Sequence, residues 1–212
     1  SASMNYRGAR AALSKFDYAS TLVVSLAMLL VRQQDPVGIV LFDEKATTIA
    51  PPRATHAQVQ MITGLLEQCQ PARKTELGEL LLTLGDQFRR RHMVVIVSDL
   101  LTDLDALYNG LNRLRFGGHE TLVMQVLDHD EVDLPFDGPT IFKDIEGDEE
   151  LFAEPRAFRR SYQKAMSDFL EEIKKGCGDR GYDHVRFLTD EPLGETLRYF
   201  LMVRDDPARA GR

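Results

Sequence analysis

Residues 93–99 read Met-Val-Val-Ile-Val-Ser-Asp, an unbroken apolar run that ends in a hydroxyl and a carboxylate. A run of this length without polar alternation is typical of a strand that is covered on both faces of a sheet. The pattern returns at residues 121–127, Thr-Leu-Val-Met-Gln-Val-Leu, which Asp128 follows. A predicted helix over residues 103–114, closed by a glycine pair, separates the two strands. Two buried strands joined by a helix indicate a parallel sheet.

Strands and helices alternate in both directions from this unit. We therefore predict an α/β fold with a doubly wound, mostly parallel sheet, one antiparallel edge strand and an inserted β-hairpin at about residues 130–155. The other predicted elements are strands at 37–42, 47–50 (the edge strand, stopped by two prolines) and 184–189, and helices at 15–33, 55–68, 75–90, 155–175 and 193–203. We expect Gly176 and Gly178 to end the longest helix.

Length and composition indicate one domain over residues 1–212, because 43% hydrophobic residues suffice for one substantial core. The net charge of −7 argues against a nucleic-acid partner, which normally requires a basic face. Cys69 and Cys177 are isolated, so neither a zinc site nor a disulfide framework is indicated, and we expect a reducing, cytoplasmic compartment. Polar residues interrupt the apolar stretch 19–31, which favours a buried helix over a membrane span.

Oxygen-bearing side chains gather where the fold places ligand sites. In parallel sheets, ligands bind beyond the carboxyl ends of the strands, where Asp99, Asp128 and, by topology, the loop of Ser1 to Ser3 are expected to converge. Together with Thr75, these residues are ligands of the kind that Mg²⁺ prefers. Each also has a simpler interpretation. The serines can be an unstructured chain end, Thr75 a helix cap, and Asp128 a helix or turn cap.

Several short motifs follow one another along nearly the whole chain, and each is weak alone. They are Ser1-Ala2-Ser3-Met4, residues 15–19, 35–38, Phe42, Pro51-Pro52, Thr75-Glu76-Leu77, 97–100, 118–120, 125–128, Glu131, Pro135-Phe136, the hairpin, Pro155-Arg156, Arg160 and Tyr162. In this order they resemble a bacterial domain-of-unknown-function family with a von Willebrand factor A-type domain, typically encoded near MoxR-type AAA+ ATPases.

The resemblance implies a Rossmann-like fold and a metal-ion-dependent adhesion site of the form Asp-x-Ser-x-Ser. Ser1 and Ser3 match the two serines, Thr75 the threonine, and Asp99 the second aspartate. The first aspartate and the central strand that carries it would precede residue 1, so we expect an N-terminally truncated domain. One carboxylate and three hydroxyls predict weak binding of Mg²⁺, because hydroxyls do not offset the cost of dehydrating this ion.

Three hypotheses about function follow. The resemblance implies a non-catalytic protein-interaction module that works with a MoxR-type ATPase or its client in the assembly or maturation of protein complexes. A Mg²⁺-dependent phosphoryl-transfer enzyme is the first alternative, but no glycine-rich phosphate loop, Asp-x-Asp pair or nucleophile elbow is present. A structural domain that self-associates through the edge of the hairpin at residues 140–153 is the second.

Overall fold

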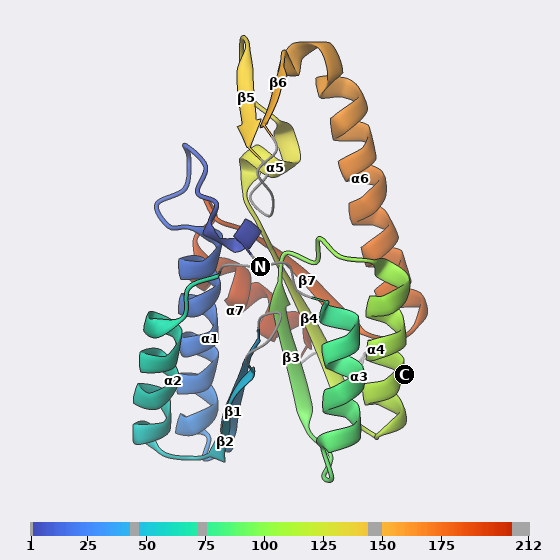
Figure 1. Ribbon diagram of the computed structural model, residues 1–212. Helices are drawn as coiled ribbons and strands as arrows, with labels where there is room; N and C mark the ends of the chain where they lie inside the picture. Colours follow the sequence, from blue (N-terminus) through green and yellow to red (C-terminus); the bar gives the residue numbers. More distant parts are fainter. Residues whose placement is uncertain (1, 43–46, 72–75, 144–149, 205–212) are drawn as a thin grey trace.

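The computed structural model describes residues 2–42, 47–71, 76–143 and 150–204 of the chain (Figure 1). No helix in these ranges is both long enough and apolar enough to cross a bilayer. The elements, in chain order, are the 3-10 helix η1 (Ala2–Asn5), α1 (Lys15–Arg32), β1 (Val37–Phe42), β2 (Thr47–Arg53), α2 (His56–Gln68), α3 (Leu77–Gln87), β3 (Met93–Ser98), α4 (Leu104–Phe116), β4 (Glu120–Leu127), α5 (His129–Asp133), β5 (Thr140–Lys143), β6 (Glu150–Ala153), α6 (Pro155–Asp179), β7 (Asp183–Leu188) and α7 (Leu193–Arg204).

The predicted α/β class and the parallel pairing are confirmed for the strands in the second half of the chain. β3, β4 and β7 form a parallel sheet with β4 in the middle. β1 and β2 pair antiparallel, and no hydrogen-bonded ladder joins them to β3 within the described residues. β2 continues through Pro51 and Pro52, which we expected to stop it. Proline is tolerated there because β2 pairs along one side and needs no donor on the other.

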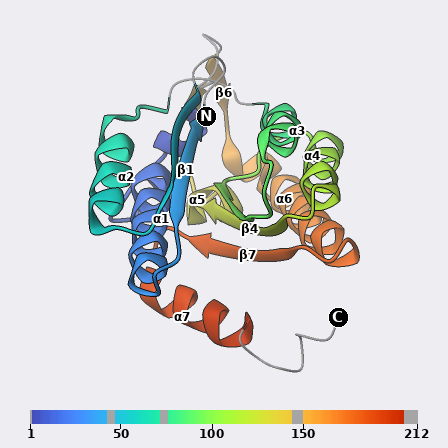
Figure 2. The same cartoon turned by 90° about the horizontal axis from the view of Figure 1, so that it is seen from below.

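Helices cover the strands from two sides, with α1 and α2 on one side and α3, α4 and α6 on the other (Figures 1 and 2). β4 supplies side chains to both layers, because successive residues of a strand point to opposite faces. Val123 packs among residues of α3, α4 and α6, whereas Leu122 and Met124 pack with α1 and β7. This double burial explains why the sequence of β4 is almost continuously apolar.

The longest helix does not end where its glycines suggested. α6 runs through Gly176, Cys177 and Gly178 to Asp179. Cys177 is completely buried, and a Cβ at Gly176 would lie 2.0 Å from the hydroxyl of Tyr108. Gly176 therefore serves close packing between α6 and α4 instead of stopping the helix.

Two further boundaries differ from the prediction. The helix predicted at residues 75–90 is α3, which spans Leu77–Gln87 and so ends three residues earlier than expected. The insertion begins with a short helix, α5, before the hairpin of β5 and β6 in which Ile141 pairs with Phe152. The middle of the predicted hairpin, residues 144–149, lies outside the described residues.

Candidate functional site

The carboxyl ends of β3 and β4 meet at one edge of the parallel sheet, where an aspartate follows each strand. Ser98 of β3 pairs with Gln125 of β4, so Asp128 leaves this edge of the sheet two residues further along than Asp99. The buried Gln125 side chain donates from Nε2 to the carbonyl oxygen of Asp99 at 3.1 Å. This bond holds the turn after β3 at the edge where parallel sheets place their ligand sites.

Asp99 lies in a polar cluster of four side chains, called the Lys15 cluster below, in which Lys15 and Asp99 are buried and Ser3 and Glu131 are partly buried. Lys15 Nζ lies 2.9 Å from Asp99 Oδ2 and 2.6 Å from Glu131 Oε1. Ser3 Oγ donates to the same Oδ2 atom at 2.5 Å. Lys15 is completely buried, and Asp99 is 3% exposed. Because a buried ion is stable only when it is paired, the ammonium and the two carboxylates depend on one another.

Lys15 reaches the cluster as the first residue of α1. Ser14 caps this helix by accepting a hydrogen bond from the backbone N–H of Asp17 at 3.1 Å. A cation at a helix N-terminus is disfavoured by the helix dipole, whereas Asp17 is favoured there. The carboxylates across the site, and not the helix itself, therefore account for a lysine at this position.

The two carboxylates that share Lys15 differ in proton affinity. Burial alone would raise the pKa of Asp99, but the charge of Lys15 and the hydrogen bond from Ser3 hold that pKa below its usual value. The pKa of Glu131 is raised, because its burial outweighs the attraction to Lys15. Asp99 is therefore the more firmly ionised partner of the ammonium.

Asp128 has a structural role next to the cluster. Its Oδ2 accepts hydrogen bonds from the backbone N–H of Gly8 at 2.9 Å and from Thr189 Oγ1 at 2.7 Å. Its Oδ1 accepts from the backbone N–H of Asp130, and Glu131 bonds back to the Asp128 N–H in a capping box. Its predicted role as a helix cap is confirmed, and these bonds join three segments of the chain, at Gly8, residues 128–131 and Thr189.

A histidine near this edge also has its ring nitrogens engaged. His129 Nδ1 lies 2.8 Å from an oxygen of Asp190, and Nε2 lies 3.5 Å from an oxygen of Asp133. A general base needs a free ring nitrogen within reach of a nucleophile. In the described part of the chain, both ring nitrogens of His129 face carboxylates, which favours a structural role.

Of the four predicted metal ligands, the structure brings Ser3 and Asp99 into contact. Ser1 and Thr75 lie outside the described residues, so their metal role stays a prediction. The sequence interpretation missed Lys15 and Glu131 as site residues. The signal for Lys15 was its place in the first turn of a helix, where a cation needs a compensating partner.

The described residues do not fit a firmly bound Mg²⁺. Among them, no group of three His, Cys, Asp or Glu side chains is arranged to hold a metal ion. Asp99 Oδ2 already receives the Lys15 ammonium and the Ser3 hydroxyl. Two unit positive charges about 4 Å apart repel by roughly 4 kcal/mol near a protein surface, and Mg²⁺ carries two charges. The ammonium of Lys15 thus supplies the positive charge that a metal cation would otherwise bring to Asp99.

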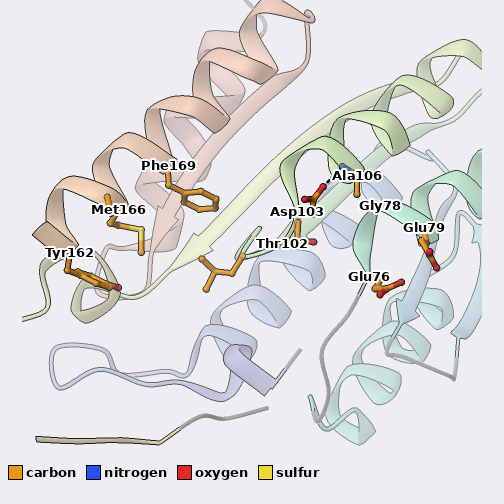
Figure 3. Close-up of a pocket in the computed structure, with 11 residues that line it drawn as sticks. Glu76, Gly78, Glu79, Thr102, Asp103, Ala106, Tyr162, Met166 and Phe169 are labelled. Atoms are coloured by element: carbon orange, nitrogen blue, oxygen red, sulfur yellow. Dashed lines mark hydrogen bonds between the residues drawn. The ribbon is translucent and has the colours of Figure 1, made fainter. Parts of the chain in front are cut away.

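An open groove of about 760 Å³ lies beside the cluster, between the N-terminal ends of α3 and α4 and the middle of α6 (Figure 3). Its lining is mainly apolar, with carboxylates on the side of α3 and α4. The lining residues are Glu76, Gly78 and Glu79 of α3 and its cap, Leu101, Thr102, Asp103 and Ala106 after β3, and Tyr162, Ala165, Met166 and Phe169 of α6.

The groove and the Lys15 cluster are directly connected. Tyr162, which lines the groove, donates from its hydroxyl to the carbonyl oxygen of Glu131 at 2.7 Å. Leu101 lines the groove two residues after Asp99, and its backbone N–H points to Asp99 Oδ1 at 3.4 Å. The cluster therefore positions both the loop after β3 and the neighbouring part of α6.

The chain is similar to one described family and to solved structures of low sequence identity. The model of DUF58, a protein family of unknown function, matches residues 1–171. A conserved hypothetical protein, BatB from Bacteroides thetaiotaomicron, has 15% identity and a TM-score of 0.58 over 96% of this chain and 93% of its own. An aerotolerance-related membrane protein from Bacteroides fragilis has 14% identity and the same TM-score over 95% and 94%. At such identities the likeness shows the fold alone. No functionally curated protein matches the chain significantly.

Proposed function

We propose that this chain, which belongs to the DUF58 family of proteins of unknown function, is a non-catalytic protein-binding module. The proposed binding surface, called the carboxyl-edge face below, consists of the loop at residues 99–103 and the groove between α4 and α6. One observation carries the proposal, namely an open, mainly apolar groove beside a cluster whose charges are already paired.

The loop of the carboxyl-edge face is held in a strained conformation. Leu100 has a φ of 58°, in the left-handed region that costs a leucine about 1–2 kcal/mol. Its side chain is completely buried, while the next residue, Leu101, is 44% exposed. Strain of this kind persists only where the surroundings hold it, and Gln125 and Lys15 hold Asp99 just before it. A fixed, exposed leucine beside an apolar groove is typical of an interaction surface.

The pairing of charges favours binding over catalysis. A general base or nucleophile must be free to accept a proton or attack a substrate. Asp99 is bound to Lys15 and Ser3, and Asp128 accepts hydrogen bonds from three groups. These carboxylates are committed to holding the fold, which supports a module that presents a surface.

The partner that we propose is a MoxR-type AAA+ ATPase, or a protein on which it acts, during assembly or maturation of protein complexes in the cytoplasm. The support is the resemblance of the sequence motifs to a family typically encoded near such ATPases. We propose further that the contact needs no divalent cation, because Lys15 already neutralises the carboxylate that such a cation would occupy.

The test is binding of the purified MoxR-type ATPase from the same genome, measured by biolayer interferometry with and without EDTA. Leu101→Asp should weaken binding at least about tenfold, because it places a charge in the apolar contact. Met61→Asp is the matched control, since Met61 is 46% exposed on α2, across the strands from the groove. Equal loss in both variants, or no binding by the unchanged protein, would refute the proposal.

The hairpin supports a second candidate function, self-association. Ile141, Leu151 and Phe152 are 56%, 63% and 71% exposed, and Ile141 pairs directly with Phe152. Exposed apolar residues on a short two-stranded edge favour pairing with another chain. Sedimentation velocity of wild type and Phe152→Lys tests this, with Phe116→Lys as the control because Phe116 is 88% exposed on α4. A monomer at every concentration would exclude self-association.

A further inference from the structure

The groove has one apolar bank, formed by α6. Tyr162, Ala165, Met166 and Phe169 occur at positions i, i+3, i+4 and i+7, so they share one face of the helix. In Figure 3, the side chains of Tyr162, Met166 and Phe169 lie along the side of α6 that faces the loop of Thr102. The stripe covers two helical turns, a length of about 10 Å. Helices usually bury such a stripe against another element.

The opposite bank is acidic. Glu76 and Glu79 come from the beginning of α3, and Asp103 caps α4 by accepting the backbone N–H of Ala106 at 2.7 Å. Among the described lining residues there is no lysine, arginine or histidine, so the side chains contribute three negative charges. The two helix N-termini offset about half a charge each, which leaves about two negative charges on this bank.

We propose that the groove binds an amphipathic helical segment of the partner, with apolar side chains against the α6 stripe and lysine or arginine along the flank that faces α3. This inference rests on the proposed function, because it names the chemistry that the carboxyl-edge face recognises. An apolar stripe at i, i+3, i+4 and i+7 accepts a partner helix with the same spacing. The acidic bank selects the sign of the flanking charges and repels an acidic segment.

The shape of the site favours a helix over a small molecule. Pockets for small ligands enclose about 70–90% of the ligand surface. Here one bank is a helix with a two-turn stripe, and Leu101 on the other side is 44% exposed. Such an open trough leaves much of a small ligand in water, whereas a helix can rest in it and keep its polar face solvated.

The experiment uses two synthetic helical peptides of about 16 residues, long enough to populate a helix. Both carry leucines at the stripe spacing in an alanine background, one with flanking lysines and the other with flanking glutamates. Fluorescence anisotropy measures their binding to the full chain. We expect the lysine peptide to bind wild type at least about tenfold more tightly than the glutamate peptide, since charge complementarity sets the preference.

Variants of the chain locate the site. Met166→Glu should weaken binding of the lysine peptide to the chain at least about tenfold. Ser167→Glu is the matched control, because Ser167 is the next residue on α6, is exposed and does not line the groove. The double change Glu76→Lys and Glu79→Lys should reverse the preference in favour of the glutamate peptide. Circular dichroism checks that each variant keeps its fold.

The inference would be overturned if wild type did not bind the lysine peptide even at about 1 mM, a concentration that detects very weak affinity. It would also be overturned if wild type and Met166→Glu bound this peptide equally well. If the chain binds neither peptide but its binding to the ATPase depends on Leu101, the inference about the helical segment is overturned and the proposed function is not. Peptide binding at the groove without any ATPase binding would instead overturn the proposed ATPase partner.

Discussion

Lys15 connects three parts of the molecule that are distant in sequence. It begins α1, pairs with Asp99 after β3, and pairs with Glu131 in α5. The ammonium has no exposed surface, so its cost of burial must be offset inside the protein, and within the described residues these two carboxylates are its charged partners. Lys15 therefore sets the local stability of the carboxyl-edge face.

Lys15→Met should lower the free energy of unfolding by about 3–5 kcal/mol, because removing one partner of a buried pair leaves the other uncompensated. Urea denaturation measures this. The control is Lys174→Met, which removes a lysine 3.7 Å from Glu171, with both side chains 71% exposed. We expect Lys174→Met to lower the free energy of unfolding by less than about 0.5 kcal/mol. Similar losses in the two variants would contradict the account of Lys15.

Divalent ions give a second prediction for the same residue. Calorimetry should show no Mg²⁺ binding to the chain tighter than about 1 mM, because Lys15 already compensates Asp99. Lys15→Met should bind Mg²⁺ more tightly than wild type, since Asp99 and Glu131 would then lack a cation. If wild type bound Mg²⁺ tightly and Lys15→Met bound it no more tightly, the Lys15 ammonium would not be taking the place of a metal ion.

His184 predicts how stability depends on pH. Burial lowers its pKa to about 4, and the charges of Arg186 and Lys174 contribute. An unfolded histidine titrates near 6.5, so on acidification the unfolded state binds its proton first. The stability that neutral His184 contributes above about pH 6.5 is lost as the pH falls towards 4. We expect the free energy of unfolding to fall by about 2 kcal/mol over this range.

Unfolding free energies at about pH 7 and 4.5 measure this effect, because the two values lie on opposite sides of the unfolded pKa. His184→Gln should reduce the loss on acidification, and His56→Gln, which changes an exposed histidine, should not. An unchanged pH dependence in His184→Gln would contradict the prediction.

At the scale of elements, the sequence predicted most strands and helices because their signals are local. The apolar runs of β3 and β4 act within a few residues, and the structure confirms both strands. The predicted end of α6 was wrong because the role of Gly176 depends on Tyr108, which is far away in sequence. Glycine alone does not tell a helix stop from a close contact between helices.

The two glycines near the end of α6 provide a matched pair of substitutions. Gly176→Ala should destabilise the protein by about 1–3 kcal/mol, because its Cβ would lie 2.0 Å from the Tyr108 hydroxyl and force it to move. Gly178→Ala has open space around its Cβ and should stabilise by about 0.5–1 kcal/mol through helix propensity. Thermal denaturation compares them. A stabilising Gly176→Ala would disprove the proposed tight contact.

At the scale of the whole molecule, the sequence located the edge of the sheet but not the arrangement on it. Topology placed Asp99 at the carboxyl end of a parallel strand, where the structure has it. The contact of Asp99 with Lys15 spans 84 residues and depends on how α1 packs beside β3, which no local pattern encodes. The groove likewise arises from three helices that meet only in the folded chain.

The carboxyl-edge face is the surface that we propose to bind a protein partner. Hydrogen-exchange mass spectrometry of the chain, alone and in complex with the MoxR-type ATPase, can locate that contact. We predict that the complex protects the backbone amides of residues 100–106 and 162–169, while exchange in α2 stays unchanged. Protection confined to α2 or to the β5–β6 hairpin, with none at these two segments, would contradict the claim.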